Sequence, residues 1–331
     1  MKRNSVVNAG ALGLVALAFS ATAPLTAFAA APALALALWR NGLGVCTLGP
    51  VVAVRRGEEL RSLLRWDRRR ELRNTVFAGV ALATHFATFM PSTQLTSVTT
   101  AAALVSTQPI WQGLIAVVCG RTLPKATWSG LGVAVLGAMV ATGGDVRVEG
   151  TAVVGDLLAI AGAIALAIYT ELSGRVRVTV STPSYSVVCF CTFTVALLMV
   201  CLVGGIQLAG FGTATWLAVF GLLLLPQLLG LSMLNFVLGR ASATTVSLVL
   251  LLEGPVAALI ALVWLGQVPS VTVVAGMALV IAGVAVAVLF DARPGRDMPS
   301  IVTDPYPALI PPRRLRPPST SPFPRSRRCT R

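Results

Sequence analysis

The chain contains ten apolar runs, each close to the roughly 20 residues that a helix needs to cross a bilayer. It is 56% hydrophobic and 11% charged, whereas soluble domains carry about 25% charged residues, which excludes that class. Backbone groups in lipid must form hydrogen bonds within their own segment, so the runs are helices. We therefore predict an all-α integral membrane protein whose ten transmembrane helices span residues 6–28, 31–54, 74–90, 94–119, 126–144, 153–171, 183–204, 214–238, 242–265 and 268–290.

The sequence around two prolines repeats at a fixed distance, because Pro255 follows Pro109 by 146 residues (255 − 109). The same shift relates three glycine pairs: Gly120 and Gly266, Gly130 and Gly276, Gly137 and Gly283. Each proline removes a hydrogen bond to the carbonyl four residues earlier, at Val105 or Leu251, so we expect two kinked helices. Matching interrupted helices in two halves indicate the binding site of a transporter.

Basic residues fix the expected orientation. With a cytoplasmic N-terminus and alternating helices, 24 of the 26 Lys and Arg residues fall on the cytoplasmic side, as the positive-inside rule requires. Five helices per half is an odd number, so the two repeats are inverted relative to each other. The predicted units are a first repeat (1–145), a second repeat (146–291) and a disordered, Pro/Arg-rich cytoplasmic tail (292–331).

The net charge of +14 needs no nucleic acid in this arrangement, because the basic residues face the cytoplasm and anionic lipid head groups. The predicted location is the cytoplasmic membrane, with both termini in the cytoplasm. A cleavable signal peptide is the alternative for residues 1–30, although its removal would leave nine helices. The six cysteines form no metal or disulfide pattern, so we expect no metal and no cofactor.

Four stretches carry a family resemblance. They are Pro32–Arg40, Pro109 with Gly120, Gly130 and Gly137, Gly155–Tyr169, and Leu252–Val256 with Gly266, Gly276 and Gly283. On these residues the chain resembles the EamA-type branch of the drug/metabolite transporter superfamily, whose ten-helix carriers consist of two EamA repeats. The resemblance covers residues 6–290 and implies a carrier of amino-acid-like or drug-like solutes, often an exporter.

The chain departs from that family pattern at three positions. Relatives place Glu directly before the proline of the second repeat, whereas Gly254 stands between Glu253 and Pro255 here. Relatives also carry Glu after the loop glycine of each repeat, where this chain has Arg121 and Gln267. A role for that loop acid therefore does not transfer to this chain.

Two charged residues fall inside predicted membrane helices. An arginine near the centre of a helix costs roughly 2.5–3.5 kcal/mol on insertion, so the charge of Arg40 requires compensation. Glu253 lies in the middle of the ninth predicted helix. In one interpretation both residues face a water-filled cavity and bind substrate or a coupling proton. In the other they form a buried ion pair or hydrogen-bond to helix ends, and they serve assembly only.

Five further polar residues are candidates for substrate binding or proton coupling. Gln108 and Gln112 share a helix face at i, i+4 spacing and offer amides either to a substrate or to a neighbouring helix. His85 is the only histidine and relays protons or serves as a buried structural residue. Tyr169 and Asn235 are weaker candidates of the same kind.

We therefore predict a secondary transporter that moves a small organic solute by alternating access. The sequence contains no Gly-x-x-x-x-Gly-Lys-[Ser/Thr] motif for ATP binding. A flippase for a lipid-linked or amphipathic substrate is the first alternative. An intramembrane enzyme is the second, although the one Glu, one His and one Arg on three predicted helices are no catalytic set. The only protein partner that the sequence leaves open is a second copy of the chain, in a homodimer.

Overall fold

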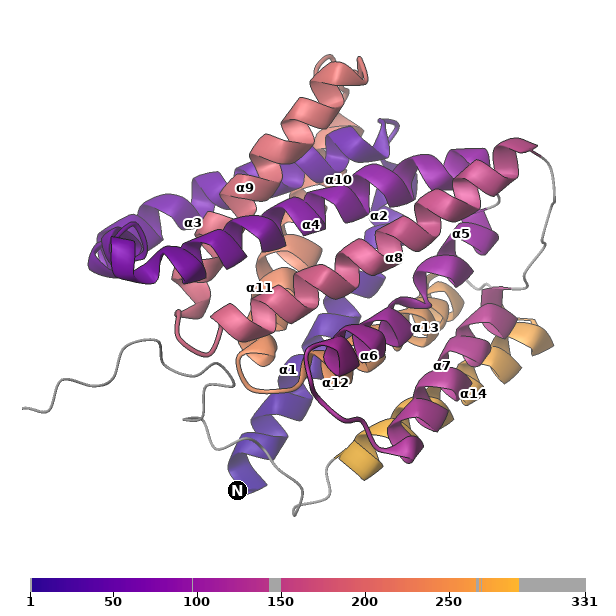
Figure 1. The fold of residues 1–331 in the computed structure, drawn as a ribbon. Helices are drawn as coiled ribbons and strands as arrows, with labels where there is room; N and C mark the ends of the chain where they lie inside the picture. The colour runs from indigo at the N-terminus through magenta and orange to yellow at the C-terminus, as the bar shows by residue number, and fades with distance from the viewer. Residues whose placement is uncertain (1, 97, 143–149, 266–267, 269, 292–331) are drawn as a thin grey trace, which may run out of the picture. The chain divides into compact units, whose positions relative to one another are not determined.

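The computed structural model describes residues 2–96, 98–142, 150–265, 268 and 270–291, and every regular element among them is helical (Figure 1). The first half contains α1 (Lys2–Ser20), α2 (Thr22–Phe28), α3 (Ala33–Leu63), η1 (Trp66–Arg68), α4 (Arg69–Leu95), α5 (Val98–Val105), α6 (Gln108–Val118) and α7 (Lys125–Thr142). The second contains α8 (Gly150–Val176), α9 (Thr182–Val203), α10 (Thr213–Leu222), the π-helix η2 (Leu223–Leu231), α11 (Ser232–Leu238), α12 (Ala243–Leu250), α13 (Glu253–Leu265) and α14 (Val271–Asp291). The predicted disordered tail lies outside the described residues.

Within the described residues, six helical segments are long and apolar enough to cross a membrane. They are Ala33–Leu63, Trp66–Leu95, Thr100–Val118, Thr151–Val176, Thr182–Val203 and Thr213–Leu238. Four shorter apolar helices overlap the remaining four predicted segments: Gly10–Ser20, Lys125–Ala141, Ala243–Val256 and Val271–Ala287. The all-α membrane architecture is therefore supported, and the count of ten crossing helices stays a prediction.

Both proline-containing helices are divided into two, which corrects the expectation of continuous, kinked helices. The first divides between α5 and α6, and the second between α12 and α13. At each break the chain makes tighter, three-residue turns, with Thr107 N–H bonded to the Leu104 carbonyl and Leu251 N–H to that of Leu248. Pro109 and Pro255 consequently lie in the first turn of a new helix, where a missing N–H costs least.

A second correction concerns residues 55–73, which the hydropathy profile assigns to a loop. Instead α3 continues to Leu63, a short 3₁₀ turn follows, and α4 begins at Arg69. Arg56 has non-helical backbone angles (φ −134°, ψ 22°), so the direction of α3 changes at the first arginines. The sequence is charged enough to leave the membrane here, and α3 nevertheless continues past Gly57.

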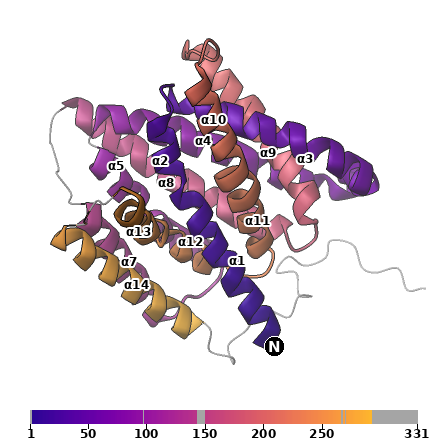
Figure 2. The ribbon, with the colours of Figure 1, turned by 180° about the vertical axis from the view of Figure 1, so that it is seen from behind.

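The last helices of the two halves, α7 and α14, lie side by side (Figures 1 and 2). Gly130 meets Gly283 and Gly137 meets Gly276, so the helices run antiparallel, as an inverted repeat requires of equivalent helices. A Cβ added at Gly276 or Gly283 would overlap the backbone of α7. The repeated glycines thus allow this close backbone approach.

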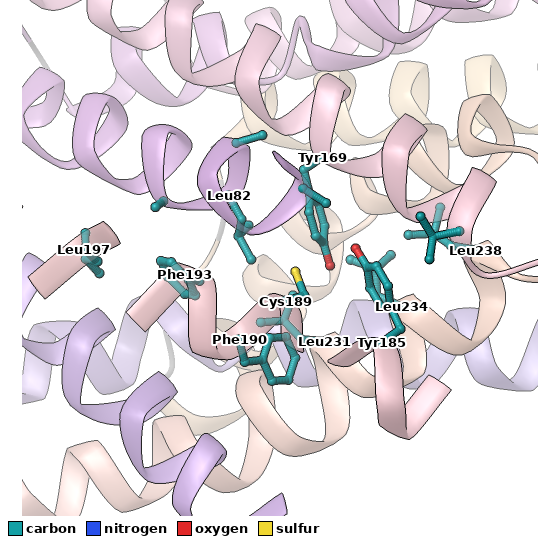
Figure 3. Close-up of a cluster of buried hydrophobic side chains, with 14 of the residues drawn as sticks. Leu82, Tyr169, Tyr185, Cys189, Phe190, Phe193, Leu197, Leu231, Leu234 and Leu238 are labelled. Atoms are coloured by element: carbon teal, nitrogen blue, oxygen red, sulfur yellow. The ribbon is translucent and has the colours of Figure 1, made fainter. Parts of the chain in front are cut away.

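The largest apolar core joins α3, α4, α8, α9 and α11. Helix α4 lies against α8, and α9 packs on both α3 and α4. Figure 3 shows Tyr169, Tyr185 and Phe190 extending into this cluster, and all three are fully buried. The core thereby fixes the helices that line the cavity described next.

Candidate solute-binding cavity

A cavity of about 530 Å³ lies among the helices of both halves. This volume falls within the roughly 300–1,000 Å³ range of small-molecule sites. Its walls are mostly apolar, with Phe19, Leu82, Phe86, Phe89 and Leu234 among them. The cavity suits an organic solute with an apolar body, and its few polar groups decide which solute.

Both broken helices meet the cavity at their breaks. Val105, Ser106 and Gln108 line it from the first break, and Leu251 and Glu253 from the second. Because each proline lacks an N–H, the carbonyls of Val105 and Leu251 lose their usual helical donors. The repeated prolines therefore leave a carbonyl without its helical donor at one lining residue of the cavity in each half.

Arg40 carries a buried positive charge at this wall. It belongs to α3, is only 4% exposed and lines the cavity. Its guanidinium carbon lies 5.0 Å from the centre of the Phe86 ring, a cation–π contact. Its Nε atom has no hydrogen-bond partner. Arg40 thus retains donor capacity at a site that bulk water reaches poorly.

Glu253 lines the same cavity from the first turn of α13 and is partly exposed. The Ser20 hydroxyl lies 3.0 Å from its backbone carbonyl, to which it donates a hydrogen bond. No ion pair joins its carboxylate to Arg40 or to any other residue that the structure describes. The assembly-only ion pair considered from the sequence is therefore absent between these two side chains.

His85 lines the cavity from α4, and its position is fixed on two sides. Its Nδ1 lies 3.0 Å from the Gly162 carbonyl, which accepts a hydrogen bond. Its ring stacks on Phe89 with 5.8 Å between the ring centres. These contacts hold the imidazole through Nδ1 and leave Nε2 as the nitrogen that a solute or proton would meet.

The two glutamines of α6 have different surroundings, although they share a face. Gln108 lines the cavity, is 3% exposed, and its Nε2 has no partner. Gln112, one turn further on, is not among the lining residues and instead bonds to α8. Its Nε2 donates to Glu171 (3.0 Å), and its Oε1 accepts from Thr170 (2.5 Å).

Tyr169 and Asn235 bond to each other. Tyr169 lines the cavity, but its hydroxyl donates to Asn235 Oδ1 at 2.7 Å. Asn235 also donates to the Ser186 hydroxyl and is not among the lining residues. Figure 3 shows the Tyr169 side chain directed into the apolar cluster. Their polar atoms therefore connect α8, α9 and α11.

Sequence reasoning missed a buried acid, Glu171, beyond the cavity. Its side chain is 7% exposed and accepts hydrogen bonds from Arg121, Arg175 and Gln112. Arg121 follows α6, whereas Arg175 is one turn after Glu171 on α8. The i, i+4 spacing of Glu171 and Arg175 was the available signal. We call these four residues the Glu171 cluster.

The Glu171 cluster lies at the arginine-rich end of the bundle. The lining residues of α6 and α8 end at Gln108 and Tyr169, and both helices continue from there into the cluster. Arg175 also contacts Cys119 Sγ at 2.6 Å. The cluster thus joins the two halves of the chain just beyond the cavity.

These observations define a class, that of multi-pass membrane proteins with a central cavity at two helix breaks. The sequence profile of the EamA-like transporter family matches residues 8–143 and again 153–289. The chain belongs to the EamA-like transporter family and contains two EamA repeats. It is thus an integral membrane protein of a family of small-solute transporters, not of enzymes.

Other comparisons concern the fold alone. No curated protein matches the chain. Several solved structures match the chain, and one of them, a protein crystal structure, does so with a TM-score of 0.71 at 22% sequence identity. The match covers 86% of this chain and 97% of that one. This similarity supports the arrangement of helices and carries no information on the solute.

Proposed function

We propose that the chain is a secondary transporter of the cytoplasmic membrane, which moves a small organic solute with an anionic group through the cavity. The buried guanidinium of Arg40 carries this proposal. A charge withdrawn from water is costly unless it is paired and hydrogen-bonded, and Arg40 keeps an unpartnered Nε beside an apolar cavity. A carboxylate or similar anion on the solute supplies the missing partner.

Other groups on the wall refine the expected solute. Gln108 offers a second unpartnered donor, and Glu253 offers a carboxylate. An amino-acid-like solute fits both charges, with its anionic group at Arg40 and its ammonium at Glu253. A drug-like organic anion fits Arg40 and the apolar wall alone.

The Glu171 cluster supports alternating access as the mechanism. Its bonds run between residues of the first repeat, Gln112 and Arg121, and residues of the second, Glu171 and Arg175. We infer that the cluster closes the cavity at its arginine-rich end, and the positive-inside rule favours the cytoplasm as the location of that end. Release of solute on that side then requires these bonds to break, as the two repeats move relative to each other.

The experiment compares pairs of solutes that differ only in the anionic group, such as aromatic carboxylates and their neutral amides. Thermal stabilisation of the purified protein is measured, and radiolabelled hits are then followed into proteoliposomes. We expect the carboxylates to stabilise wild type and Arg40→Lys and to lose about tenfold or more in affinity in Arg40→Gln. Equal responses of the three proteins to every pair would refute the anion site.

The same experiment tests the alternatives. A solute that crosses the bilayer and is recovered unchanged excludes the enzyme interpretation. Water-soluble hits that move without lipid translocation exclude the flippase. Net uptake of solute by inside-out vesicles, and not by right-side-out vesicles, would establish export.

A proton-coupling role for Glu253 has its own test. If Glu253 carries a coupling proton, then Glu253→Gln retains solute exchange but loses transport driven by a pH gradient. If it only binds an ammonium group, then the substitution weakens amino-acid-like solutes and spares plain carboxylates. Glu58→Gln, at an exposed acid outside the cavity, is the matched control.

A further inference from the structure

Residues 55–73 form a connection between α3 and α4 that the transport cavity does not use. We call this segment the arginine elbow. It contains eight arginines and four acidic residues, a net charge of +4. We propose that the arginine elbow binds the head groups of anionic phospholipids, with Trp66 inserted at the membrane interface.

The depth of the elbow follows from an abrupt change in its exposed side chains. On α3, Val51 and Val54 are exposed apolar residues, and Arg55 follows immediately. On α4, Arg73 is the last exposed arginine, and Val76 and Phe77 are exposed apolar residues after it. The edge of the hydrocarbon layer therefore crosses both helices at these points, and the elbow lies at head-group level.

The length of α3 agrees with this placement. Its first 22 residues, 33–54, precede the elbow and correspond to about 33 Å of helix, enough to cross the roughly 30 Å hydrocarbon core. The non-helical Arg56 then redirects the final turns of α3. The elbow thus starts where α3 has crossed the membrane.

Four arginines of the elbow are exposed and carry charges that no described acidic residue neutralises. Arg55, Arg61, Arg65 and Arg73 are exposed, and none forms an ion pair with a residue that the structure describes. Two of the four acids are engaged elsewhere. Glu59 accepts hydrogen bonds from Ser181 and Ser184, and Glu71 pairs with Arg68 at 3.7 Å. Among the described residues, these four cations are therefore free to bind anionic groups at the membrane surface.

Apolar side chains beside these cations favour a lipid over a soluble anion. Trp66 is 75% exposed and Leu64 is 71% exposed. Arg69 lies over the indole, 3.0 Å from the ring centre. An amphipathic tryptophan is most stable at the membrane interface, and a soluble anion would leave Trp66 and Leu64 in water.

The elbow is also held in place, so its cations form a fixed surface. Glu59 reaches Ser181 N–H at 2.8 Å and Ser184 Oγ at 2.8 Å, at the start of α9. Arg68 Nη2 donates to the Thr179 carbonyl at 3.2 Å. Lipid binding here needs little ordering of the backbone and acts on three helices at once.

The test uses the full chain in nanodiscs of phosphatidylcholine that contain either brominated phosphatidylglycerol or brominated phosphatidylcholine. Bromine quenches tryptophan fluorescence, and Trp66→Phe identifies the signal of the elbow. We expect brominated phosphatidylglycerol to quench the Trp66 signal at least about fivefold more effectively at equal mole fraction, because one arginine near an anionic surface already contributes about 1 kcal/mol.

The variant Arg61→Gln/Arg65→Gln/Arg73→Gln is expected to abolish this preference. Arg313→Gln/Arg314→Gln/Arg316→Gln makes the same change of charge in the C-terminal stretch and should retain it. A high salt concentration should weaken the preference of wild type by screening, which tests the proposal even if the triple variant misfolds. Equal quenching by the two lipids, an equal loss in both triple variants, or full competition by inorganic phosphate would each overturn the proposal.

Discussion

The two helix breaks interrupt the chain in a similar way, but they present different side chains to the cavity. At the first break, Gln108 presents an amide to the cavity, and its helix continues into the Glu171 cluster. At the second, Glu253 presents a carboxylate, and the residue equivalent to Gln112 is Ala258, which has no polar side-chain atoms. The comparison indicates that duplication supplied the break, and that later divergence placed an amide bonded to Glu171 after the first break and a carboxylate at the second.

The largest expected effect comes from removing the acid beyond the first break. Glu171→Ala leaves Arg121 and Arg175 without their ion pair and Gln112 without an acceptor. Breaking a fully buried pair costs about 3–5 kcal/mol, and the partial exposure of both arginines lowers our estimate to about 2 kcal/mol. Unfolding in detergent measures this loss. Glu58→Ala, at an exposed acid, should change nothing, and equal stabilities of the two variants would remove the cluster's role.

The same substitution, glutamine to leucine, is expected to have effects of intermediate size at two positions one helical turn apart. Its effects on the free energy of unfolding should differ in sign. Gln112→Leu loses its bonds to Glu171 and Thr170 and should lower the free energy of unfolding by about 1–2 kcal/mol. Gln108→Leu removes a buried amide whose Nε2 has no partner, so stability should hold or rise while solute affinity falls about fivefold. Chemical unfolding and solute titration on both variants separate the two roles. A loss of stability in Gln108→Leu as large as in Gln112→Leu would contradict the comparison.

The smallest expected effect on stability comes from replacing the proline that each of the two breaks contains. Pro109→Ala and Pro255→Ala each restore an N–H in the first turn of a helix, facing the carbonyl of Val105 or Leu251 that the proline leaves without its helical donor. We expect losses below about 1 kcal/mol in both variants, and similar rates of transport. A much larger loss in one of them, measured in the same unfolding assay, would show that the breaks are not equivalent.

The sequence alone indicated the polar residues that line the cavity better than it indicated which residues form hydrogen bonds or ion pairs with one another. Arg40 and Glu253 were identified because charges inside apolar helices are rare, and the proline repeat indicated both interruptions. Periodicity could not separate Gln108 from Gln112, because their difference depends on where α8 lies. Glu171 was missed for the same reason, since Arg121 is 50 residues away in the chain. The helical elbow escaped the hydropathy profile, which detects apolarity and not helix ends.

The bond network of Glu59 has a consequence for biosynthesis. This residue of the first repeat accepts hydrogen bonds from Ser181 and Ser184, at the N-terminal end of α9 in the second repeat. The first turn of α9 therefore lacks these acceptors until it meets a helix that was made and inserted earlier. A second repeat expressed by itself would carry an unfinished helix end, so the order of synthesis matches the order in which the parts become complete.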